Sequence, residues 1–67
     1  MDISQEEFGN LIKGLLQLDP NIKKEIANFL GVSHPTVERW ASIPSGPRGQ
    51  QLRNSAYKAL KKRFLTD

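Results

Sequence analysis

The sequence predicts an all-α protein, a compact bundle of four to five short helices with two closely joined helices at its centre. Apolar residues recur at helical spacing in four separate stretches of the chain. No stretch alternates between apolar and polar residues with the period of two that marks a half-buried strand. The 67 residues form one domain at most, and its stability is marginal because a chain this short buries only about 60% of its unfolded surface.

The first predicted helix covers residues 5–17. Ser4 and Glu7 form a capping box, in which each side chain accepts a hydrogen bond from a backbone N–H that the helix start leaves unpaired. Gly9 and Gly14 each weaken this helix by about 1 kcal/mol relative to alanine. The apolar stripe that follows the cap comprises Phe8, Leu11, Ile12 and Leu15.

The second predicted helix begins at Asp19 and Pro20 and ends at Leu30. Asp19 suits the N-cap, and Pro20 suits the first turn of a helix, where a missing N–H costs little. Ala27 is small at a point where the next helix must cross closely. We expect four apolar side chains to face inward from this helix: Ile22, Ile26, Phe29 and Leu30.

A tight turn at Gly31 joins the second helix to a third, which is predicted over residues 34–41. Glycine lacks a Cβ, so it readily adopts the positive φ that ends a helix sharply. Ser33 suits the N-cap of the third helix, and Pro35 falls within its first turn. These residues together predict a helix-turn-helix.

A loop rich in proline and glycine covers residues 42–49, and a fourth helix is predicted from residue 48 or 50 to residue 64. Trp40 lies three residues after Val37 on one helical face, so we expect it in the core rather than stacked on a nucleic-acid base. The predicted core therefore comprises Phe8, Leu11, Ile12, Leu15, Ile26, Leu30, Val37, Trp40, Leu52, Ala56 and Leu60.

Charge is distributed unevenly along the chain. The net charge is −3 over residues 1–20, +1 over residues 21–45 and +5 over residues 46–67, which gives +3 in total. This polarity favours a polyanionic partner. The densest basic cluster comprises Lys58, Lys61, Lys62 and Arg63. It serves equally well as a solvated face, a membrane-surface helix, a protein-binding helix or a DNA-binding helix.

Several classes of function are excluded by the residue types. The chain has no cysteine and one histidine, which excludes a disulfide, a thiolate zinc site, a cysteine nucleophile and a histidine-rich metal site. No apolar stretch approaches the roughly 20 residues of a membrane span, and the acidic start does not resemble a signal peptide. We expect a cytoplasmic protein with no enzymatic activity, no catalytic residues, no metal, no cofactor and no small-molecule ligand.

The stretch from Glu25 to Trp40 resembles the helix-turn-helix of the phage-repressor-like family, the Cro-type transcriptional regulators. It reads EIANFLGVSHPTVERW, and members of the family often read IAxxLGVSxxTVxRW, followed by a loop and a further amphipathic helix. The resemblance implies a lambda-repressor-like domain over residues 1–67. It further implies that the third helix enters the major groove of double-stranded DNA, often in a dimer on a two-fold-symmetric site.

The resemblance assigns base contacts to three residues of the third helix, His34, Pro35 and Arg39. Arg39 has the geometry for two hydrogen bonds to the O6 and N7 atoms of guanine. Pro35 departs from the polar residue that the family often has at this place, and it offers only an apolar contact, for example to a thymine methyl group. The alternative for His34 and Arg39 is an exposed side chain without a role in binding.

A second set of residues is predicted to contact phosphates. Lys23 and Lys24 match places where the family typically contacts phosphate, and such contacts position the protein without specifying sequence. Thr36 and Ser33 carry hydroxyls at a helix start that favours anions, although Ser33 is first of all an N-cap. Arg48 lies in the loop, within reach of phosphate beside the third helix. Solvated side chains are the alternative for the two lysines.

The sequence therefore favours sequence-specific DNA binding, with transcriptional regulation as the biological role. Two alternatives remain open on the same scaffold: a protein-interaction module that uses the last helix, and a DNA-recognition subunit of a recombination or packaging complex. The family resemblance and the small size also lead us to expect a homodimer.

Overall fold

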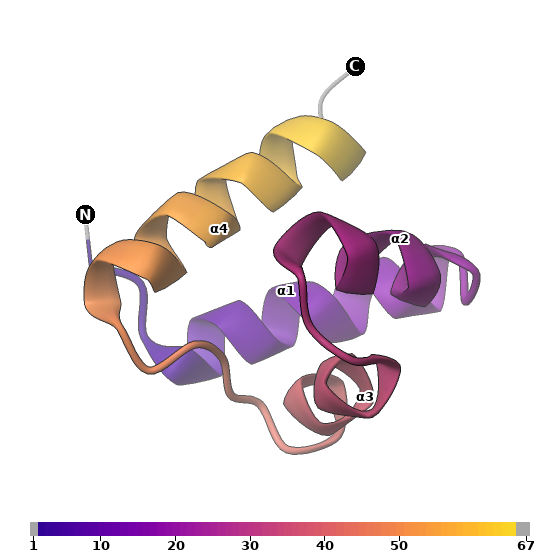
Figure 1. Cartoon of the computed structure of the whole chain (residues 1–67), viewed down its shortest axis with the longest axis horizontal. Helices are drawn as coiled ribbons and strands as arrows, with labels where there is room; N and C mark the ends of the chain where they lie inside the picture. The colour runs from indigo at the N-terminus through magenta and orange to yellow at the C-terminus, as the bar shows by residue number, and fades with distance from the viewer. Residues whose placement is uncertain (1, 66–67) are drawn as a thin grey trace.

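The computed structural model describes residues 2–65, so Met1, Thr66 and Asp67, the ends of the predicted 1–67 domain, lie outside the described residues. Within that range the chain is all-helical and has no strand. The prediction of a small all-α bundle is confirmed, with the lower of the two expected helix numbers (Figure 1). The four helices are α1 (Gln5–Leu18), α2 (Ile22–Leu30), α3 (His34–Ser42) and α4 (Gln50–Phe64).

The central element of the bundle is α1, which packs against each of the other three helices. In Figure 1, α4 runs above α1, and α3 lies below it and is seen almost end-on. The start of α1 carries the predicted capping box, because the Ser4 hydroxyl accepts from the Glu7 N–H at 3.0 Å and the Glu7 carboxylate accepts from the Ser4 N–H at 3.3 Å. The capping box fixes the start of α1, and α1 in turn supports α3 from the inside of the molecule.

The core fills the space between α1 and the other helices. Phe8 of α1 and Trp40 of α3 meet edge to face, with ring centroids 5.5 Å apart. The predicted Leu11 and Leu30 are half-buried and pack against this core. The core residues proper are Ile3, Phe8, Ile12, Leu15, Ile26, Ala27, Val37, Trp40, Ala56 and Leu60.

Two glycines allow the loop after α3 to lie directly on α1. A Cβ on Gly9 would stand 2.2 Å from the backbone nitrogen of Ser45, and a Cβ on Gly46 would stand 2.7 Å from the ring of Phe8. Both distances are far below ordinary van der Waals contact. Gly9 therefore weakens the helix locally but permits the close contact that anchors the loop.

The prediction that Leu52 lies in the core is wrong. Leu52 is 63% exposed, and its neighbour Arg53 is 7% exposed. Both positions lie at helical spacing from the buried Ala56 and Leu60. Arg53 precedes these two residues by three and seven positions, and Leu52 precedes them by four and eight. The face that α4 turns inward is the one with Arg53, because that side chain finds hydrogen-bond acceptors inside the molecule.

Two expectations for the second helix also need correction. Phe29 is 43% exposed rather than inward, and its ring lies under the guanidinium of Arg63, 5.2 Å from the ring centroid. The helix begins at Ile22 with Asn21 as its N-cap, so Asp19 is not the cap residue. The Asp19 carboxylate instead accepts a hydrogen bond from the Asn21 N–H in the turn before the helix.

Candidate nucleic-acid interface

The turn between α2 and α3 has the geometry that the sequence predicts. Gly31 adopts φ 70° and ψ 34°, the left-handed conformation that ends α2. The N–H of Val32 donates to the Ala27 carbonyl at 3.0 Å, which satisfies a carbonyl at the end of α2. The turn is therefore short and well bonded, and it fixes the direction in which α3 starts.

The start of α3 is capped by Ser33, as predicted. Its hydroxyl accepts from the Thr36 N–H at 3.3 Å and lies 2.8 Å from the Thr36 hydroxyl. Pro35 falls in the first turn. The two hydroxyls bond to each other within the protein, and Thr36 is half-buried. Their clearest role is to hold the helix start in shape.

Buried and exposed residues divide α3 into an inner and an outer face. Val37 and Trp40 are buried, and Trp40 packs on Phe8 of α1, which confirms that Trp40 belongs to the core. We call the exposed residues of this helix the outer face of α3: His34, Pro35, Glu38, Arg39 and Ser42. Because the inner face is fixed by large apolar side chains, the outer face points away from the bundle.

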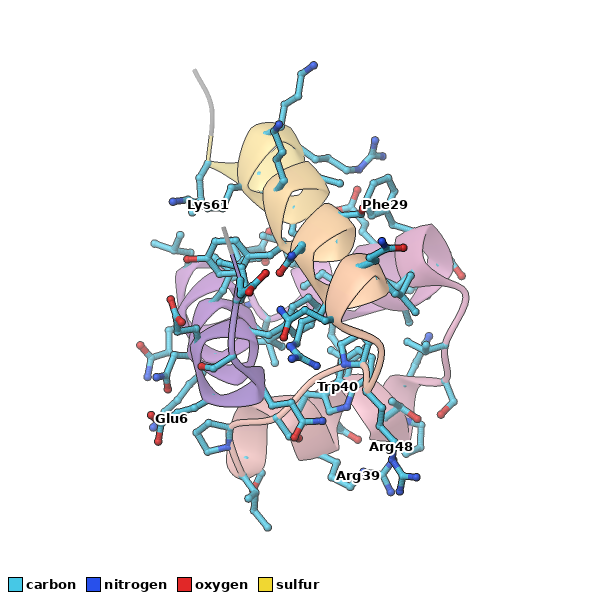
Figure 2. The ribbon with its side chains drawn as sticks, turned by 90° about the vertical axis from the view of Figure 1, so that its left-hand side faces the viewer. Glu6, Phe29, Arg39, Trp40, Arg48 and Lys61 are labelled. Carbon is cyan, nitrogen blue, oxygen red and sulfur yellow. The ribbon has the colours of Figure 1, made fainter. Side chains whose placement is uncertain are left out.

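Arg39 and Arg48 are the arginines at this end of the molecule. Both are exposed, and Figure 2 shows both side chains extending at the lower edge, on the side of α3. Arg39 comes from the helix itself, and Arg48 comes from the loop that follows it. Trp40, labelled in the same view, lies further inside. Two predicted DNA-binding side chains are thus presented at one edge of the protein.

The predicted phosphate contacts at the start of α2 lie close to the start of α3. Lys23, Lys24 and His34 line one shallow hollow together with Pro20 and Asn21. Lys24 and His34 are exposed, and Lys23 is partly so. The fold therefore brings residues from both helices to one basic surface.

Lys23 also bonds to an acidic residue that the sequence interpretation did not single out. Its Nζ atom lies 2.9 Å from the Oε2 atom of Glu38, which belongs to the outer face of α3. The hydrogen bond and the positive charge of Lys23 lower the pKa of the Glu38 carboxyl below its ordinary value of 4.5. Glu38 is therefore ionised at neutral pH, and the ion pair links α2 to α3.

The buried Arg53 holds the loop that carries Arg48. Its guanidinium donates to the carbonyl of Pro47 at 2.5 Å and to the carbonyl of Arg48 at 3.1 Å. It also donates to the Ile3 carbonyl at 2.6 Å and to the Gln50 side-chain oxygen at 2.7 Å. A guanidinium presents five donors in a fixed plane, so this one side chain of α4 ties two other backbone segments, at Ile3 and at Pro47–Arg48, to the helix.

The sequence analysis missed this role for Arg53 and counted it only in the net charge of residues 46–67. Its partners are backbone carbonyls, one of them in a residue 50 positions away, and a carbonyl leaves no mark in a residue pattern. The available signal was its spacing of three and seven residues from Ala56 and Leu60. That spacing applied to the apolar Leu52 almost equally well.

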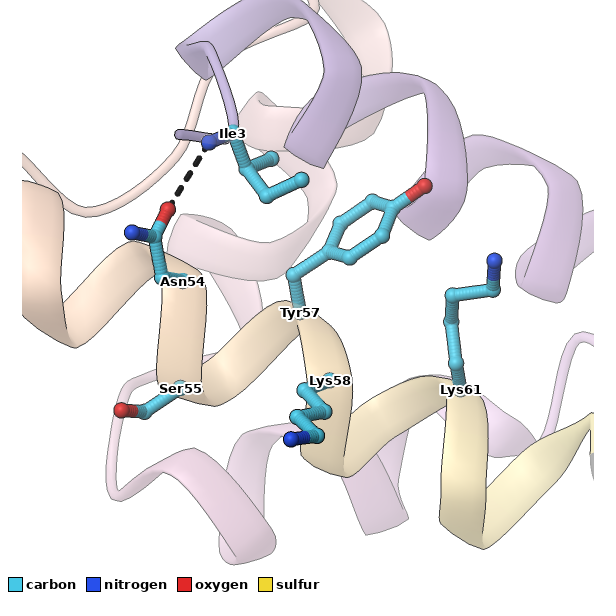
Figure 3. Close-up of a pocket in the computed structure, with 6 residues that line it drawn as sticks. All are labelled: Ile3, Asn54, Ser55, Tyr57, Lys58 and Lys61. Atoms are coloured by element: carbon cyan, nitrogen blue, oxygen red, sulfur yellow. Dashed lines mark hydrogen bonds between the residues drawn. The ribbon is translucent and has the colours of Figure 1, made fainter. Parts of the chain in front are cut away.

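The basic cluster of α4 lies away from the outer face of α3. Figures 1 and 2 place the last turns of α4 and the helix α3 at opposite ends of the molecule. The Lys61 ammonium lies 5.4 Å from the centroid of the Tyr57 ring. An open pocket beside it, drawn in Figure 3, is lined by Ile3, Asn54, Ser55, Tyr57, Lys58 and Lys61.

Among residues 2–65, no group of three or more histidine, cysteine, aspartate or glutamate side chains is placed to hold a metal ion. None of the helices in that range is both long enough and apolar enough to cross a membrane. No family model matches the chain, and it matches no curated protein and no solved structure.

Proposed function

We propose that this protein binds double-stranded DNA in a sequence-specific manner, with α3 in the major groove, and that it acts as a transcriptional regulator. The observation that carries the proposal is the division of α3 into a face fixed by Val37 and Trp40 and an exposed face with Arg39. The major groove is about 12 Å wide and admits one α-helix. A capped, well-anchored helix at the edge of a small domain meets that requirement.

Three residues of the outer face of α3 are assigned to base edges. The Arg39 guanidinium donates to the O6 and N7 atoms of a guanine, the commonest specific contact between protein and DNA. His34 lies at the first position of the helix, where its ring can donate to a base or to phosphate. Pro35, beside it, presents an apolar ring to a thymine methyl group.

Phosphate contacts flank this helix on two sides. Lys24 and Lys23 lie at the start of α2, and Arg48 lies in the loop after α3. Such contacts set the register of the protein on the duplex. The Arg53 hydrogen bonds hold the Arg48 backbone in a fixed position, which lowers the entropy that Arg48 would lose on binding.

The proposal is tested by selecting bound duplexes from a random pool and then measuring affinity for the selected sequence at two salt concentrations. We expect one enriched motif. If the protein makes about six phosphate contacts, affinity should fall roughly 10³-fold between 50 and 200 mM salt. Enrichment of no motif, with weak binding to every duplex, would contradict sequence-specific binding.

A second candidate function, association with another protein, is favoured by one apolar groove. Leu18 is 71% exposed and Leu65 is 45% exposed. They line the groove together with Asn10, Leu11, Gly14 and Leu15. Because we expect a homodimer, we assign this groove to a second copy of the chain. Sedimentation equilibrium of the wild type and of Leu18→Gln tests this, and a monomeric wild type would contradict it.

A further inference from the structure

The outer face of α3 carries one carboxylate, that of Glu38. An acidic group is unexpected on a surface that we propose to bind DNA, which is a polyanion. Glu38 lies immediately before Arg39, and its side chain is 57% exposed. A negative charge on this face is repelled by the phosphates on both sides of the groove. The Glu38 carboxyl is ionised at neutral pH, and its charge is paired with the Lys23 ammonium at 2.9 Å.

An ionised carboxylate can only accept hydrogen bonds, which limits what Glu38 can contact in a major groove. Guanine presents two acceptors there, and thymine presents an acceptor and a methyl group. Adenine presents a donor beside an acceptor, so its N7 atom repels the carboxylate. Cytosine presents only the N4 amino group, a donor. Cytosine is therefore the base that an ionised Glu38 can accept from without facing an acceptor of the same base.

We infer that Glu38 is a specificity-determining residue that accepts a hydrogen bond from the N4 amino group of a cytosine. The inference rests on the proposed function, since it requires α3 to occupy the major groove. The geometry that supports it is an exposed carboxyl beside Arg39: Lys23 of α2 bonds to the Oε2 atom at 2.9 Å, and the Glu38 side chain is still 57% exposed. The ammonium also reduces the repulsion between Glu38 and the nearby phosphates.

The test compares the motifs selected from a random duplex pool by the wild type and by three variants. Glu38→Gln exchanges the acceptor for an amide that pairs with adenine, so one position should change from cytosine to adenine. Glu38→Ala should make that same position degenerate, with loss of a roughly tenfold preference for cytosine. The control is Glu25→Gln, which removes an equal charge from an exposed residue of α2 and should leave the motif unchanged.

The outcomes separate this inference from the proposed function. If the wild type enriches no motif, both fail. If it enriches a motif that Glu38→Gln and Glu38→Ala leave the same at every position, the role of Glu38 fails and DNA binding stands. The inference would also be overturned if the two Glu38 variants bound all duplexes more tightly by the same factor as Glu25→Gln does. Glu38 would then act only through its charge and not through a base contact.

Discussion

Phe8 and Trp40 meet edge to face at a centroid distance of 5.5 Å with an interplanar angle of 86°, and this contact joins α1 to the inner face of α3. Phe8 is fully buried and Trp40 nearly so. Edge-to-face aromatic pairs contribute about 0.5–1.5 kcal/mol beyond the area that they bury. The orientation of α3, and hence of its outer face, depends on this pair.

Trp40→Ala is therefore expected to remove a large part of the protein's stability. Loss of a buried tryptophan costs about 3–5 kcal/mol, and a chain of this size has a total stability of about 3–10 kcal/mol. Trp40→Phe should cost less, because an aromatic edge can still reach Phe8. Urea unfolding followed by far-ultraviolet circular dichroism measures both. A wild-type midpoint for Trp40→Ala would show that the contact is dispensable.

Gly9 and Gly14 lie in the same helix and should respond in opposite ways to alanine. Alanine favours a helix over glycine by about 1 kcal/mol, and a Cβ on Gly14 has no neighbour within 4 Å. Gly14→Ala should therefore stabilise the protein by up to about 1 kcal/mol. A Cβ on Gly9 meets the backbone of Pro44 and Ser45, which cannot move without shifting the loop.

Gly9→Ala should therefore destabilise the protein by about 1–3 kcal/mol, the usual cost of overpacking. The two variants share their chemistry and helix, so each serves as the control for the other in a thermal unfolding experiment. Equal stabilisation by both would mean that the loop does not lie on α1 as described.

Arg53 and Leu52 provide a second matched pair, in which the polar residue should matter more for stability. Truncation of Arg53 to alanine leaves the carbonyls of Pro47 and Arg48 without this donor, while the Ile3 carbonyl keeps its hydrogen bond from the Gln50 side chain. Buried groups left unsatisfied cost about 1–3 kcal/mol, so we expect a loss in that range or somewhat above it.

Leu52→Gln is the control, and it should change the free energy of unfolding by less than about 0.5 kcal/mol because the side chain is 63% exposed. Denaturant unfolding of the two variants gives the comparison directly. A larger loss for Leu52→Gln than for Arg53→Ala would restore the core position that the sequence interpretation assigned to Leu52.

The cases of Leu52 and Arg53 show why some features follow from sequence and others do not. The Ser4 capping box and the left-handed Gly31 depend on atoms within a few residues, so local chemistry predicts them. The buried position of Arg53 depends on its hydrogen bond to the Ile3 carbonyl, 50 residues away, and the spacing of apolar residues does not contain that information. The fold class was therefore predictable from sequence, whereas the choice of Arg53 over Leu52 as the buried residue of α4 was not.

The candidate site divides in the same way. Exposure of His34, Pro35 and Arg39 on the outer face follows from helical spacing once Val37 and Trp40 are buried. The pairing of Lys23 with Glu38 joins two helices across 15 residues, and it depends on the angle at which they cross. Neither residue type nor spacing gives that angle.

The ion pair of Lys23 and Glu38 predicts a specific dependence on pH. The pKa of Glu38 is lowered in the folded state, chiefly by the hydrogen bond from Lys23. The unfolded state therefore binds a proton at a higher pH than the folded state does. The stabilisation should be complete above the ordinary pKa of 4.5 and should be lost as the pH falls through the lower folded value.

A carbon-detected NMR titration of the Glu38 carboxyl measures this directly. The midpoint should lie below 4.5 in the wild type and should return toward 4.5 in Lys23→Gln. The side chains are exposed, so high salt should weaken the shift. A midpoint that Lys23→Gln leaves unchanged would show that the pair does not form in solution.

Arg39→Ala is expected to weaken binding to the selected duplex by about 1–3 kcal/mol if Arg39 donates to a guanine. The loss should be confined to specific binding and should relax the preference at one base position, because the contact carries sequence information. Lys13→Ala is the control, since it removes an equal charge from an exposed residue of α1. Lys24→Ala should instead weaken binding about equally across sequences and reduce the salt dependence. Fluorescence anisotropy with selected and scrambled duplexes distinguishes these effects, and an Arg39→Ala protein with wild-type affinity and preference would remove Arg39 from the interface.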